Sequence, residues 1–196
     1  MLPWIAAIVL AFGLLHMCSE AGHTPPPPRG QIAASEPLQE AVDDAPVMAY
    51  GDYRLRQLAD FDIRARVLGR SRYRWDEVAD LSPVDLVLGW GPMSDSDVLA
   101  EISITQSGRF YYWHVDRFPI PRADIERHSA NMHMIPATDA IADQLDSVRP
   151  DELIHIRGRL VEATRGDGLI WRSSLTRNDV GAGACELVWV EQLERP

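Results

Sequence analysis

The chain has 196 residues and a formal net charge of −10. This acidic balance argues against affinity for nucleic acid, because phosphate binding needs a positively charged surface. With Cys18 and Cys185 as its two cysteines, the chain has no cysteine framework for zinc, and we expect neither a metal nor a cofactor.

The N-terminal segment, residues 1–18, contains no charged side chain. We interpret residues 1–20 as a membrane anchor or uncleaved signal, in which residues 2–20 cross the bilayer once. Two alternatives stay open: cleavage near Ala21, which gives a secreted or periplasmic protein, and lipidation of Cys18. All three place the remainder of the chain outside the cytoplasm.

Residues 21–47 are polar and punctuated by proline, with four consecutive prolines at 25–28. Such a run favours stiff polyproline II structure, and the residues around it bury too little apolar surface to fold. We therefore predict a flexible tether over residues 21–47. By their length, residues 48–196 are expected to form a single β-rich domain.

Between residues 53 and 75, apolar side chains at odd positions alternate with arginines at even positions. This period predicts a half-buried antiparallel strand, which Gly69 breaks or bulges. The even positions form a solvated sheet face or, as the alternative, a binding site for an anionic ligand. The side chains proposed for that site are Arg64, Arg66, Arg70 and Arg72.

The rest of the chain predicts short strands around a helical insert at residues 119–148. Within the insert, apolar spacing places a helix over 139–148, with Thr138 as its N-cap. A helical turn is expected at 94–100, capped by Ser94 or Asp95. Strands are expected at 86–90, 102–105, 109–115, 153–163, 169–175 and 186–190. Together these elements predict a mainly β (α+β) fold, a small antiparallel β-barrel of the oligonucleotide/oligosaccharide-binding (OB) type with one or two helices.

Two local features have both a structural and a functional interpretation. Tyr111, Tyr112 and Trp113 fit core and edge packing, and the alternative is a stacking platform for bases or sugars. Cys185 begins an apolar strand and is expected to be a small buried core side chain.

No motif in the chain names a reaction. His128 and His133 are five residues apart, whereas paired zinc ligands on a helix prefer i, i+4 spacing. Ser174 and Asp179 belong to a second polar cluster, but the Gly-x-Ser-x-Gly pattern of a nucleophile elbow is missing. These four residues are the catalytic candidates that the chain offers.

The anchor, the tether and a β-rich domain without a catalytic signature indicate a membrane-tethered module that binds or assembles components of the cell envelope. Its expected partner is an envelope protein or an anionic ligand. The alternative is a hydrolase or metal-dependent enzyme whose site gathers His128, His133, Ser174 and Asp179. A shared pocket for these four side chains would favour the enzyme.

Overall fold

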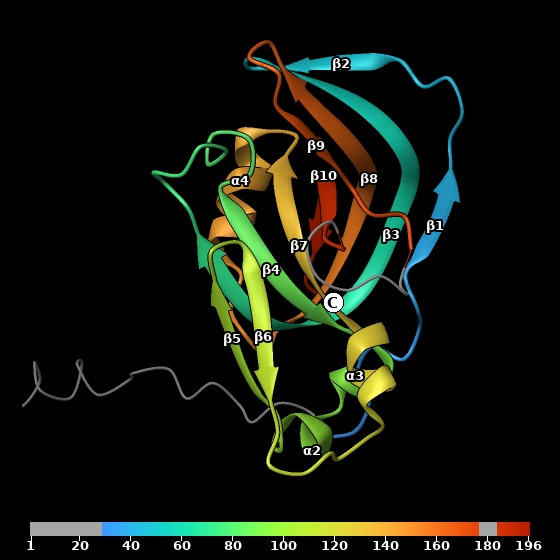
Figure 1. Cartoon of the computed structure of the whole chain (residues 1–196). Helices are drawn as coiled ribbons and strands as arrows, with labels where there is room; N and C mark the ends of the chain where they lie inside the picture. The colour runs from blue at the N-terminus through green and yellow to red at the C-terminus, as the bar shows by residue number, and fades with distance from the viewer. Residues whose placement is uncertain (1–28, 177–183) are drawn as a thin grey trace, which may run out of the picture.

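The computed structural model describes residues 29–176 and 184–196 (Figure 1). Two sequence predictions fall outside the described residues: the membrane anchor, within residues 1–28, and the placement of Asp179, within residues 177–183. In the described part, no helix combines the length and apolar character needed to cross a bilayer.

The described chain is mainly β, with one large mixed sheet of eight strands and a separate hairpin formed by β5 and β6. The strands are β1 (Leu38–Ala41), β2 (Val47–Tyr50), β3 (Tyr53–Arg72), β4 (Val84–Gly89), β5 (Ser103–Ser107), β6 (Phe110–His114), β7 (Ser129–Pro136), β8 (Leu153–Arg165), β9 (Ile170–Arg172) and β10 (Glu186–Glu194). The helices are short: η1 (Gly91–Ser94), α2 (Ser96–Leu99), α3 (Arg122–Arg127) and α4 (Asp139–Ser147).

The large sheet is partly closed on itself. Pairing runs from β3 through β4, β7, β10 and β8, and β8 pairs again with β3. The β7–β10 pairing is parallel, whereas the other pairings in this ring are antiparallel. The large sheet is therefore mixed and not antiparallel throughout as expected for the antiparallel barrel, because the chain leaves β7 through α4 and β8 and returns as β10 in the direction of β7.

The alternation predicted for the first long strand is confirmed in β3. Up to Ala65, most odd-numbered residues of β3 are buried and most even-numbered ones are exposed or half-buried. Register shifts occur between Gln57 and Ala59 and between Val67 and Gly69, so the bulge expected at Gly69 is present. The interior of the ring is apolar, and α4 adds Ile141 and Leu145 to the same core cluster.

Local sequence signals predicted the N-caps of α4 and α2. The Thr138 side chain accepts a hydrogen bond from the Ile141 amide and so caps α4 as predicted. Of the two candidate caps for α2, Asp95 is the one that accepts from a backbone amide, that of Asp97. The β5–β6 turn consists of Gly108 and Arg109, both with positive φ, so Arg109 lies in the turn and not in the strand expected at 109–115.

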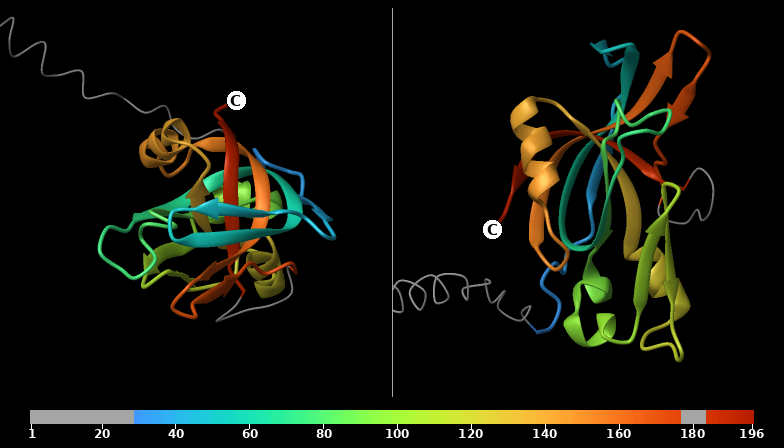
Figure 2. Two further views of the ribbon diagram at one scale, coloured as in Figure 1. Left: turned by 90° about the horizontal axis from the view of Figure 1, so that it is seen from above. Right: turned by 90° about the vertical axis from the view of Figure 1, so that its left-hand side faces the viewer.

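The helical insert predicted at residues 119–148 is interrupted by β7, a strand of eight residues. The residues of β7 are buried on both faces, so their hydrophobic pattern does not distinguish a strand from a buried helix segment. Figure 1 shows α2 and α3 at the end of the molecule opposite β2 and β9. In the right view of Figure 2, α4 and the β5–β6 hairpin lie on different flanks.

Contacts with the folded part begin before residue 48, within the segment predicted as a tether. Gln31 forms an isolated bridge with Asp95, and the Gly91 amide donates to the Ala33 carbonyl. Strand β1 pairs with β3 over residues 38–41. Residues 31–41 therefore lie against the sheet and the η1–α2 segment.

Candidate functional site

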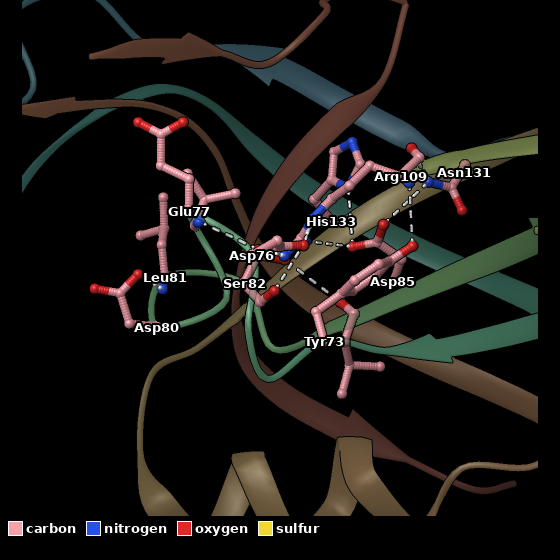
Figure 3. Close-up of polar contacts among 12 residues, drawn as sticks. Tyr73, Asp76, Glu77, Asp80, Leu81, Ser82, Asp85, Arg109, Asn131 and His133 are labelled. Atoms are coloured by element: carbon pink, nitrogen blue, oxygen red, sulfur yellow. Dashed lines mark hydrogen bonds and ion pairs between the residues drawn. The ribbon is translucent and has the colours of Figure 1, made fainter. Parts of the chain in front are cut away.

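A buried polar cluster lies on the outer face of β4 and β7 (Figure 3). At its centre is Asp85 of β4, whose side chain is fully buried. Arg109 Nη1 donates to Asp85 Oδ1 at 3.0 Å, and Asn131 Nδ2 donates to Asp85 Oδ2 at 3.4 Å. A buried carboxylate is retained only when paired in this way, because removing the charge from water is costly.

Arg109 joins the tip of the β5–β6 hairpin to the β3–β4 connection. Its guanidinium donates two hydrogen bonds to Asp76, at 2.9 and 2.8 Å, and a third to the Ser82 carbonyl at 2.9 Å. The same group lies over the Tyr73 ring, 3.9 Å from its centroid. These contacts compensate the left-handed backbone at Arg109, where φ is 70°.

His133 of β7 completes the cluster. Its Nδ1 lies 2.9 Å from Asp85 Oδ1, but the approach is not aligned as a hydrogen bond, and Nδ1 has no hydrogen-bond partner in the described part of the chain. The imidazole packs on Trp171 of β9, with ring centroids 4.6 Å apart. The arrangement holds the imidazole between a carboxylate and an indole.

The Asp76–Arg109 pair has a predictable pH dependence. Burial raises the pKa of Asp76, but the hydrogen bonds and charge of Arg109 outweigh it and leave the pKa below its usual value. The Asp76 carboxylate therefore binds a proton more readily in the unfolded chain than in the folded one. The Asp76–Arg109 pair stabilises the fold above about pH 4, and this stabilisation is lost as pH falls through the lowered pKa of Asp76.

We expect the difference in unfolding free energy between the wild type and Asp76→Asn to shrink as pH falls from about 5 to about 2. Urea denaturation across that range measures the difference. Asp52→Asn, at an exposed position, is the control. A difference in unfolding free energy that stays constant over the whole pH range would contradict a lowered pKa of Asp76 in the folded chain.

Two cavities flank the outer face of β7 and share Phe110 and Cys185 in their linings. The first, which we call the β6 groove, has a volume of about 570 Å³ and lies between β6, α3 and the start of β7. The second, the Trp171 cavity, has about 460 Å³ and includes His133 and Arg109 in its wall. Cys185 is half-buried here, not fully buried as expected.

The basic side chains that line these cavities lie beside acidic partners. Arg122 of the β6 groove donates to Glu126 at 2.8 Å, and the His114 Nε2 lies 3.5 Å from Asp116. In the Trp171 cavity, Arg109 is paired as above, and Arg172 donates to Glu162 at 2.8 Å. The cavity walls therefore offer aromatic surface without unpaired positive charge.

The catalytic candidates are not brought together among the described residues. His133 lies in the Trp171 cavity, whereas His128 and Ser174 line neither cavity. His128 Nδ1 is 2.8 Å from the Asp124 carbonyl, and the Ser174 hydroxyl donates to the Thr176 carbonyl at 3.2 Å. In the described part, no group of three or more His, Cys, Asp or Glu side chains is placed to hold a metal ion.

The four arginines proposed for an anionic ligand differ in their surroundings. Arg66 is 2% exposed and donates to Asp151 at 2.7 Å, so it does not belong to a solvated face. Arg70 donates to the Asp146 carbonyl, and Arg72 pairs with the Asp146 carboxylate. Arg64 is exposed and is the member of the set best placed to meet a ligand.

Sequence reasoning missed Asp85 and Arg109 as members of a site. One signal was present: an acidic side chain inside the apolar run 84–89 needs a partner wherever that run is buried. The partner itself is far away in the chain, and no local pattern identifies it. In comparisons with models of protein families, with curated proteins and with solved structures, the chain matches none of them.

Proposed function

We propose that this chain is a membrane-tethered, extracytoplasmic binding module of the cell envelope, and that its ligand occupies the β6 groove. The observation that carries the proposal is the pair of adjoining cavities on the outer face of β7, with Phe110 and Cys185 in both. Ligand sites are concave, mostly apolar and few per protein. The uncharged N-terminal run supports the tether.

The sheet topology supports the same location. We take the ring of β3, β4, β7, β8 and β10, with α4 between its third and fourth strands, as an OB-like barrel. Barrels of that type bind ligands on the face of their second and third strands and with the loops next to it. Here those strands are β4 and β7, and the cavities also take in Val78 and residues 169–172 and 184–185.

The character of the lining supports a binding role for an uncharged ligand. Phe110, Tyr112 and Phe118 are 39%, 55% and 50% exposed. Exposed aromatic side chains around a concave surface are typical of recognition sites, since they give a large contact area at low entropic cost. The paired cations give no support for a polyanion such as nucleic acid.

Photo-crosslinking in intact cells tests this function. A benzoylphenylalanine residue replaces Tyr112, which lines the β6 groove, or Trp75, which is 95% exposed and lines neither cavity. We expect irradiation to give a discrete adduct from position 112 and no such adduct from position 75, with the protein retained in the carbonate-washed membrane fraction. Equal adducts at both positions, or none at 112, would overturn the binding site, and release by carbonate would overturn the anchor.

A further inference from the structure

The shape of the β6 groove follows the edge of a strand. Six consecutive residues, 110–115, line it. Consecutive residues of a strand point to opposite faces, so a cavity above one face would contact only every second residue. A cavity lined by all six therefore follows the strand's edge, beside its backbone.

That edge carries backbone groups that the β5–β6 ladder does not use. In the part of the chain that the structure describes, β6 pairs with β5 alone, and the two-residue turn makes Ser107 and Phe110 a hydrogen-bonded pair. Hydrogen-bonded and non-hydrogen-bonded pairs alternate in an antiparallel ladder, so the N–H and C=O groups of Tyr111 and Trp113 point away from β5. These groups form no other backbone hydrogen bond in the described part of the chain.

From this geometry we infer that the β6 groove takes an extended peptide segment, which adds to β6 as a further strand. The inference rests on the proposed binding function and names the ligand of the same groove. Main-chain hydrogen bonds to Tyr111 and Trp113 supply affinity, and alternate side chains of the peptide enter the groove on either face of the new strand.

Within β6 itself, the sequence devices that often prevent such pairing are missing. Among the devices that block exposed edges are lysine, proline and a bulge in the edge strand. Strand β6 has the sequence FYYWH, which contains none of these residues, and its pairing with β5 shows no register shift. An aromatic edge without these devices, beside a cavity, is suited to accepting a partner strand.

Charge complementarity selects the kind of peptide. The groove is also lined by Arg122 and Glu126 of α3, which neutralise each other, and by the small side chains Ser129 and Ala130. A strand of the length of β6 accommodates about five residues at ~3.4 Å each. The fitting ligand is therefore an uncharged segment of about this length with an apolar side chain at every second position.

The test uses a phage-displayed library of random seven-residue peptides, selected on the full chain in detergent solution. Two variants at one position separate the backbone from the side chain. Tyr111→Ala removes the ring but keeps the N–H, whereas Tyr111→Pro removes both and, because this N–H points away from β5, costs no bond within the hairpin. We expect the selected peptides to bind Tyr111→Pro at least tenfold more weakly than Tyr111→Ala.

Hydrogen exchange on the wild-type chain gives a second measurement that needs no variant. We expect peptide binding to slow exchange of the Tyr111 and Trp113 amides. Equal affinity of both variants together with unchanged exchange would overturn strand addition. Selection of no peptide, with binding of soluble oligosaccharides that depends on Tyr112, would overturn the peptide ligand but leave the binding function intact. Absence of the crosslinked adduct at position 112, described above, would overturn both the binding function and the peptide ligand.

Discussion

Replacing Gly158 by alanine is expected to cause the largest loss of stability of any single methyl addition in the described chain. A Cβ at this position would lie 1.9 Å from the Trp189 carbonyl oxygen and 3.3 Å from the Val190 Cα. Both neighbours are backbone of β10, so neither can rotate away. The strands must separate, at a cost of about 3 kcal/mol or more, and the melting temperature is expected to fall by roughly 10 °C.

Gly166→Ala is the matched control for this effect. No atom lies within 4 Å of a Cβ built at Gly166, and its backbone is not left-handed. Its change in unfolding free energy is expected to stay within about 0.5 kcal/mol. Thermal melts of both variants measure the difference, and a Gly158→Ala protein as stable as wild type would contradict the close approach of β8 and β10.

Asp85→Ala is expected to have the second largest effect. The substitution removes the acceptor of Arg109 and Asn131 and the carboxylate beside His133, inside a cluster where Asp85 has no exposed surface. Breaking a buried pair from one side leaves its partner charge poorly solvated, which costs about 3 kcal/mol. Because Arg109 lies at the tip of the β5–β6 hairpin, hydrogen exchange in β5 and β6 is also expected to accelerate.

The control for this cluster is Asp76→Ala, which removes the other carboxylate bound to the same guanidinium. The Asp76 side chain is 35% exposed, so water replaces its contacts. The Asp76→Ala variant is expected to lose about 1 kcal/mol of unfolding free energy. Urea denaturation distinguishes the two, and equal losses would mean that Asp85 is not the centre of the cluster.

Local interactions explain the features that the sequence predicted. The buried and exposed positions of β3 could be predicted because its side chains alternate with period two over many residues. The cap of α4 could be predicted because Thr138 and the Ile141 amide are three residues apart. The bulge near Gly69 likewise depends on the backbone preference of a single residue.

By itself, then, the sequence determined the alternating faces of β3, the cap of α4, and the mainly β character of the chain. Tertiary structure alone decided that residues 129–136 form a strand, because an apolar run buried on both faces has no diagnostic period. It also decided the parallel pairing of β7 with β10 and the contact of Asp85 with Arg109, 24 residues away, and with Asn131, 46 residues away. Such contacts follow from how whole strands close into a ring, and short-range patterns do not encode which distant partners then meet.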